Sequence, residues 1–168
     1  MRLTQIIRRG FVCFEMNTCD EPPEDPEYDR AKHVRSVKKA AVAEICGLFD
    51  GGGQVLNRNK LFKDLWNREK RATTAVGSGI AIPHVRTMQA RGLILGFSRS
   101  TPGLSFDAPD NEPVHLFLSI IGPRHEETAY LKIYREIAKL FQYPAAHRML
   151  MEAADEWEVM RVLDGHLE

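Results

Sequence analysis

Apolar residues recur along this chain in two periods, and the two periods alternate. Helical spacing predicts helices over residues 30–49, 60–70 and 126–141, followed by shorter helices beginning at Pro144 and Asp155. Strand-like apolar runs occupy residues 11–14, 80–82, 93–98 and 113–121. The run at 113–121 is apolar at almost every position, which predicts that helices cover both of its faces. We therefore predict an α/β fold, a three-layer α/β/α sandwich with a mixed β-sheet.

Turn-forming residues refine this prediction. Thr101-Pro102-Gly103 and Ala108-Pro109-Asp110-Asn111 both read as turns, and they lie between two of the predicted strands. We therefore expect residues 93–99 and 113–121 to pair as an antiparallel hairpin. Asn59 is expected to cap the helix over 60–70, and Trp66 is expected to lie in the core.

Residues 19–29 differ in character from the rest of the chain, with six acidic residues and three prolines. Such a segment buries little apolar surface and is expected to be a solvated, mobile loop rather than an acidic docking site. We therefore predict a single domain over residues 1–168 with an acidic, Pro-rich insertion at about 19–33.

Composition narrows the functional classes. The chain has 168 residues, is 43% hydrophobic and carries 23 basic and 23 acidic residues, so no global basic excess points to nucleic acid or to a membrane surface. No apolar stretch reaches the length of a membrane span, and no direct membrane insertion is expected. The three cysteines form no C-x-x-C pair, which favours a reducing, cytoplasmic location.

The chemically suggestive segment is residues 73–86, where a turn of small residues precedes a short strand, a proline and one histidine. Pro83 restricts the backbone on both sides and so places His84. Hydroxyl groups and glycine backbone N–H groups are suited to binding an anion. On this ground the candidate phosphate ligands are Thr73, Thr74, Gly77, Ser78 and Gly79. Arg68 lies close enough in sequence to balance the anion's charge.

Several common motifs are absent from this segment. Gly77-x-Gly79 lacks the third glycine of a dinucleotide-binding turn and the Gly-Lys-Ser/Thr of a P-loop. No second metal ligand is well placed in sequence, so we expect no metal and no cofactor. Imidazole is a good nucleophile toward phosphorus, which makes His84 a candidate phosphoryl acceptor; a purely structural histidine is the alternative.

The sequence of this segment resembles that of one known family. Arg68-Glu69, Thr73-Thr74 and Gly77-x-Gly79-Ile80-Ala81-Ile82-Pro83-His84 closely resemble the enzyme IIA domain of the phosphoenolpyruvate-dependent sugar phosphotransferase system, fructose–mannitol class. The likeness extends over nearly the whole chain apart from about residues 19–33, and the opening residues resemble the stand-alone, nitrogen-regulatory branch.

The resemblance implies a function and partners. His84 would accept a phosphoryl group from a small phosphocarrier protein (HPr-like) and relay it to an enzyme IIB or hold it as a signal for a regulated target. Arg68 would assist, and Thr74 and Gly79 would belong to the loop around the phosphate. The protein would thus be a phosphotransferase, with no nucleic acid as partner.

One position departs from the family pattern. The family usually carries a second histidine where this chain has Tyr130, whose hydroxyl can donate a hydrogen bond to a phosphoryl oxygen but adds no positive charge. His125 lies five residues earlier and is expected to be an exposed loop residue. The alternative function is therefore a regulatory binding module that keeps the fold without transferring phosphate.

Overall fold

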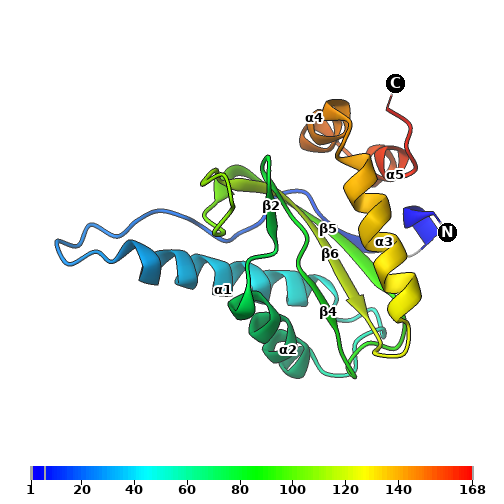
Figure 1. The fold of residues 1–168 in the computed structure, drawn as a ribbon, viewed down its shortest axis with the longest axis horizontal. Coiled ribbons are helices and arrows are strands. Elements are labelled where there is room, and N and C mark those ends of the chain that lie inside the picture. Colours follow the sequence, from blue (N-terminus) through cyan, green and yellow to red (C-terminus); the bar gives the residue numbers. More distant parts are fainter. Residues whose placement is uncertain (1, 6, 168) are drawn as a thin grey trace.

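The predicted α/β architecture is confirmed by the structure, a computed structural model that describes residues 2–5 and 7–167. Within these residues the helices are η1 (Leu3–Gln5, a 3-10 turn), α1 (Arg30–Leu48), α2 (Arg58–Arg71), α3 (Glu127–Leu140), α4 (Pro144–Glu152) and α5 (Glu156–Leu163). The strands are β1 (Ile7–Cys13), β2 (Ala75–Gly77), β3 (Ile80–Ala81), β4 (His84–Arg86), β5 (Ile94–Leu104) and β6 (Val114–Gly122). In Figure 1, α1 and α2 lie on one side of the strands and α3, α4 and α5 on the other.

The sheet is mixed and is built around the predicted hairpin. β5 and β6 pair antiparallel, with Leu95 opposite Ile120 and Phe97 opposite Leu118, as expected from the sequence. The strand order is β1-β5-β6-β3-β2, and β4 also pairs with β6. β1 runs parallel to β5, while β3 and β4 both run parallel to β6. β6 is therefore the strand on which the segment leading to His84 is laid.

Two local predictions are wrong. Thr101-Pro102-Gly103 is part of β5 rather than a turn, and the register with β6 shifts between Arg99 and Leu104. The residues that suggested a turn instead form an irregularity inside a long strand, with Gly103 at a φ of 83°. Helix α2 is capped by the side chain of Asn57, which accepts from the Lys60 N–H at 2.9 Å, and not by Asn59.

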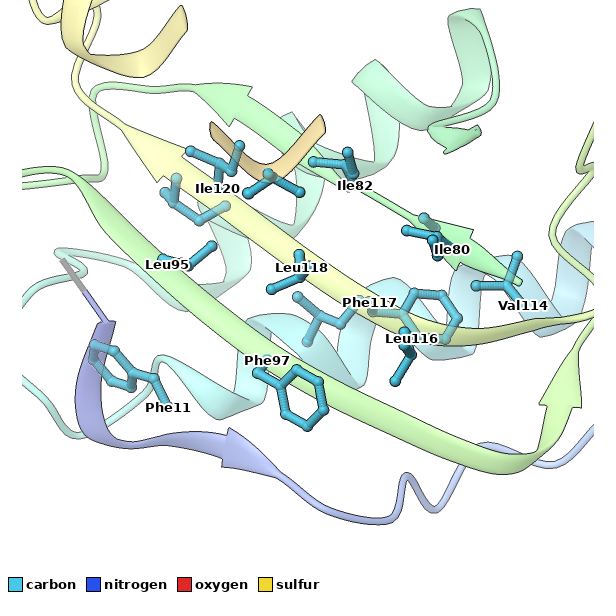
Figure 2. Packing of buried hydrophobic residues seen from close by; sticks show 14 of the residues in the cluster. Phe11, Ile80, Ile82, Leu95, Phe97, Val114, Leu116, Phe117, Leu118 and Ile120 are labelled. Atoms are coloured by element: carbon cyan, nitrogen blue, oxygen red, sulfur yellow. The ribbon is translucent and has the colours of Figure 1, made fainter. Parts of the chain in front are cut away.

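The hydrophobic core lies on both faces of β5 and β6. Figure 2 shows Phe97, Leu118 and Ile120 among the side chains packed along these two strands. Every residue of β6 except His115 is buried, which explains its nearly continuous apolar sequence. Trp66 is also buried, as predicted.

The acidic segment connects β1 to α1. Residues 14–29 contain no helix or strand, and residues 21–29 are exposed. It is attached to the domain by Asp20, which accepts hydrogen bonds from the Ser105 N–H at 2.7 Å and the Ser105 hydroxyl at 2.6 Å. Asp29 caps α1 by accepting from the Ala31 and Lys32 N–H groups. Because α1 begins at Arg30, the predicted end of the insertion at residue 33 falls inside a helix.

Among the residues that the structure describes, no helix is both long enough and apolar enough to cross a bilayer.

Candidate functional site: a histidine–arginine pocket

His84 is positioned by two short strands that lie end to end beside β6. β3 pairs with β6 at Leu116 and Phe117, and β4 begins at His84, which lies opposite Ile120. Pro83 separates the two strands because it has no N–H to donate to the ladder, while its carbonyl accepts from the Ile120 N–H at 2.9 Å. The histidine is therefore held by a rigid sheet rather than by a free loop.

The hydrogen bonds of the imidazole identify its tautomer. Nδ1 of His84 lies 2.6 Å from the carbonyl oxygen of Ile82. A carbonyl oxygen can only accept, so Nδ1 carries the proton and Nε2 keeps a free lone pair. Nη2 of Arg68 lies 3.3 Å from that Nε2. The more nucleophilic nitrogen of the ring thus faces a guanidinium group.

Burial lowers the pKa of His84 below its ordinary value because the charged ring is poorly solvated there. The hydrogen bond to the Ile82 carbonyl works against this shift, the Arg68 charge adds to it, and Glu69 opposes it. The net effect keeps His84 neutral near pH 7, which is the state in which Nε2 can act as a nucleophile.

The pocket beside His84 has a volume of about 490 Å³ and is rich in arginine. Its lining consists of Asp64, Asn67, Arg68, Arg71, His84, Val85, Arg86, Arg124 and Tyr130. Arg86 is paired with Glu127 at 3.2 Å, and Asp64 accepts from the Thr87 hydroxyl at 2.6 Å. A pocket with four guanidinium groups and one engaged carboxylate is suited to an anion.

Tyr130 lines this pocket together with His84. Its ring centroid is 6.0 Å from that of His84, and the ring of Tyr134 lies closer still, at 5.4 Å in an edge-on arrangement. Burial raises the pKa of Tyr130, so its hydroxyl remains protonated and available as a donor. Among the residues that the structure describes, none forms a hydrogen bond with that hydroxyl. His125, by contrast, is a surface residue with 79% of its side chain exposed.

The two threonines face inward to the protein rather than to the pocket. The Thr74 hydroxyl donates to Glu69 at 2.5 Å, and the Thr73 hydroxyl donates to the Phe106 carbonyl at 2.7 Å. Neither residue lines the pocket beside His84. The expectation that they bind phosphate is corrected: their hydroxyl groups satisfy buried acceptors.

The Gly77-Ser78-Gly79 turn is also distant from His84. It closes the β2–β3 hairpin, where the Ser78 N–H donates to Asp110 at 2.8 Å. The Gly79 carbonyl accepts from the N–H groups of His115 and Leu116, whereas His84 is opposite Ile120. Four to five residues of extended strand correspond to about 13–16 Å. The expectation that this turn binds a phosphate at His84 is therefore corrected. The positive φ values of Gly77 and Gly79 instead allow the chain to form a tight hairpin.

Comparison with known proteins identifies the family of this chain. The sequence profile of the family described as "Phosphoenolpyruvate-dependent sugar phosphotransferase system, EIIA 2" matches residues 29–166. The chain belongs to this EIIA family. The resemblance noted in the sequence is thus confirmed, and the match begins at the end of the acidic segment.

Individual relatives of this EIIA chain carry two kinds of name. A fructose-specific EIIA component of Haloferax volcanii is 30% identical over 149 residues, which cover 89% of each chain. A nitrogen regulatory protein of Bradyrhizobium diazoefficiens is 31% identical over 127 residues, covering 75% of this chain and 82% of that protein. A fructose-specific EIIABC component of Bacillus subtilis is 26% identical over 129 residues, and the matched part is only 20% of its length.

A solved structure shares the fold of this EIIA chain. The crystal structure of the nitrogen regulatory protein IIA-Ntr from Neisseria meningitidis superposes with a TM-score of 0.77 at 24% identity. The superposition covers 95% of this chain and 97% of that chain.

Glu69 supports the EIIA pocket from inside the protein. Its side chain has no exposed surface and accepts from the Thr74 N–H at 3.0 Å and from the Thr74 hydroxyl. Nζ of Lys38, itself buried, lies 3.1 Å from the Glu69 carboxylate and 3.0 Å from that of Asp107. Because Arg68 immediately precedes Glu69, this network also holds the residue that faces His84.

Sequence reasoning missed several pocket residues. Arg86 and Arg124 were not singled out, although Arg86 is only two positions beyond His84 on β4. Arg124 follows β6, and its proximity depends on the parallel pairing of β4 with β6, for which the sequence carries no clear signal. Arg71, the last residue of α2, also lies in the His84 pocket.

We expect Glu69→Gln to destabilise the protein by about 2–3 kcal/mol, because a buried ammonium group loses its fully buried counter-ion. The free energy of unfolding is measured by urea denaturation at pH 7. The matched control is Glu136→Gln, which breaks the solvent-exposed pair with Lys139 and is expected to cost less than about 0.5 kcal/mol. Equal losses in the two variants would contradict a supporting role for the buried pair.

We expect NMR titration to place the pKa of His84 below the ordinary value of about 6.5. Loss of nucleophilicity on acidification should follow this lowered pKa, because only the protonated ring lacks a lone pair at Nε2. Arg68→Ala should raise the pKa, since it removes a positive charge that disfavours protonation. Arg148→Ala, at an exposed position of α4, is the control and should leave the pKa unchanged. A His84 pKa above the ordinary value, or one insensitive to Arg68, would contradict this electrostatic description.

Proposed function

We propose that this EIIA protein accepts a phosphoryl group on Nε2 of His84 from a phosphocarrier protein and then relays it or holds it as a signal. The observation that carries the proposal is the hydrogen bond between Nδ1 of His84 and the carbonyl of Ile82, at 2.6 Å. This bond leaves the Nε2 lone pair as the nucleophile, in a pocket lined by four arginines of which Arg68 contacts that nitrogen.

The transfer would proceed by displacement at phosphorus. Nε2 of His84 attacks the phosphorus atom of the donor's phosphohistidine, and the donor's P–N bond breaks as the new one forms. The donor nitrogen keeps the electron pair of the broken bond. The His84 ring gains positive charge, which the Nδ1–H shares with the Ile82 carbonyl. Passing the group onward reverses these steps with a new acceptor.

Arg68 and Tyr130 would stabilise the phosphoryl group during the transfer. Nη1 of Arg68 donates to the Ala72 carbonyl at 2.9 Å, so its guanidinium is anchored while Nη2 reaches the active nitrogen. When the phosphoryl group arrives, Nη2 turns from the nitrogen lone pair to a phosphoryl oxygen. Tyr130 supplies its unbonded hydroxyl as a further donor at the place where the family usually has a histidine. These contacts act on charge that develops during transfer.

The relatives support both a relay and a regulatory use of the site, since their names include a fructose-specific EIIA component and a nitrogen regulatory protein. The partners that follow are a phosphocarrier protein as donor and an EIIB domain or a regulated protein as receiver. The replacement of the family's second histidine by Tyr130 favours one alternative, a regulatory module that binds partners without efficient transfer.

We expect phosphoramidate, a small chemical phosphoryl donor, to label the protein with one acid-labile phosphate. His84→Gln should abolish the label, because glutamine keeps a polar side chain of similar reach but has no nucleophilic nitrogen. Phosphorylation is measured by intact mass before and after mild acid treatment.

The control for this labelling is His125→Gln, since His125 is an exposed histidine outside the pocket. It should be labelled like the unmodified protein. Label that persists in folded His84→Gln would locate the acceptor elsewhere. A folded, unmodified protein that takes no label would favour the non-transferring alternative.

A further inference from the structure

The His84 pocket carries more positive charge than one phosphoryl group requires. A phosphoryl group brings about two negative charges near pH 7. Arg68 contacts Nε2 of His84, and Arg86 is already paired with Glu127. Arg71 and Arg124 are both exposed, and within the described part of the chain neither side chain has a hydrogen bond or an ion pair. Two guanidinium groups at the mouth of the pocket are thus uncommitted.

The basic character continues along α2 beyond the pocket. This helix contains six basic residues and two acidic ones, and its exposed Lys60 and Lys63 lie one turn before the pocket residues Asp64 and Asn67. Both acidic residues are engaged internally, Asp64 by Thr87 and Glu69 by Lys38 and Thr74. The surface formed by Arg71, Arg124, Lys60 and Lys63 is hereafter called the basic face, and the Glu127 carboxylate beside the pocket is already paired with Arg86.

The chain as a whole is neutral, with 23 basic and 23 acidic residues, so this excess reflects segregation of charge. Six acidic residues are collected in residues 20–29, on the connection that Figure 1 shows projecting beyond the N-terminal end of α1, away from α3. A local field of this kind orients and accelerates the approach of an oppositely charged partner.

Exposed apolar side chains accompany the charges. Met88 is 70% exposed and follows Thr87, whose hydroxyl holds Asp64 of the pocket lining. Leu131 is 44% exposed and lies one helical turn beyond Glu127, the partner of Arg86. Such residues are suited to form apolar contacts inside a ring of charges, as protein interfaces do.

We propose that the protein that exchanges phosphate with His84 docks on the basic face through an acidic surface that surrounds its own phosphoryl-bearing residue. The inference rests on the proposed function, because it takes the His84 pocket as the place of transfer. It adds that the partner's surface is negatively charged. It also adds that Arg71 and Arg124, which take no part in the transfer step, select for that charge.

The test measures binding of an unphosphorylated phosphocarrier protein in two engineered forms. Residues within about 10 Å of its histidine, the Debye length near 0.1 M salt, are changed to aspartate in one form and to lysine in the other. At about 50 mM salt we expect the acidic form to bind at least about tenfold more tightly, and at about 500 mM the difference should largely vanish. Binding is measured by calorimetry on the full chain.

Charge reversal on this protein provides the second arm. Arg71→Glu combined with Arg124→Glu should remove or invert the preference for the acidic form. The matched control, Lys32→Glu with Arg148→Glu, reverses two exposed charges outside the basic face and should keep the preference. Lys60→Glu with Lys63→Glu is a second variant of the basic face and should weaken the preference in the same direction.

Several results would overturn the inference. One is equal or tighter binding of the lysine form, and another is a preference that survives reversal of Arg71 and Arg124. Tighter binding of a single-stranded RNA of about 20 nucleotides than of the acidic carrier would identify a nucleic-acid surface instead.

Labelling of the unmodified protein by phosphoramidate separates the two proposals. Label without any charge preference overturns the docking surface alone. A charge preference without label supports the surface and overturns acceptance by His84.

Discussion

Glu69 is a carboxylate without exposed side-chain surface, and it joins three segments of the chain. It belongs to α2, accepts two hydrogen bonds from Thr74 before β2, and pairs with Lys38 of α1. A buried charge is tolerated only when its partners are in place, so these segments can be arranged in few ways. The end of α2, and with it Arg68, is thereby held at a fixed position over the sheet.

The other half of the site is held by the sheet itself. β4 starts at His84 and continues along β6 where β3 ends, with Pro83 between them. The Ile82 carbonyl, just before that break, receives the Nδ1 proton of His84. One constraint from the helical layer and one from the sheet thus meet at the pair formed by Nε2 of His84 and Nη2 of Arg68, 3.3 Å apart.

Much of this arrangement could be predicted because it depends on local patterns. Two apolar runs separated by turn-forming residues indicated the β5–β6 hairpin, and helical spacing indicated α1, α2 and α3 with bounds close to those observed. His84 and Arg68 were expected to act together, and they lie in contact although 16 residues separate them. Tyr130 was placed at the site through the family resemblance and lines the same pocket.

The errors arose where one residue type serves two purposes. Glycines and small hydroxyl residues bind anions, but they also build tight hairpins and satisfy buried carboxylates, and here Gly77, Gly79 and Thr74 do the latter. Pocket residues such as Arg124 depend on which strands become neighbours, and parallel pairing leaves little trace in local sequence. The candidate anion-binding groups therefore come from arginines on three separate segments rather than from one contiguous loop.

The central claim is that Nε2 of His84 is the phosphoryl acceptor. The most direct measurement is ¹⁵N–³¹P correlation NMR on the protein labelled at its histidines and phosphorylated by phosphoramidate. Our account predicts coupling of phosphorus to Nε2 of His84, with the Nδ1 proton retained against the Ile82 carbonyl. Phosphorus coupled to Nδ1, or to a nitrogen of another histidine, would contradict it.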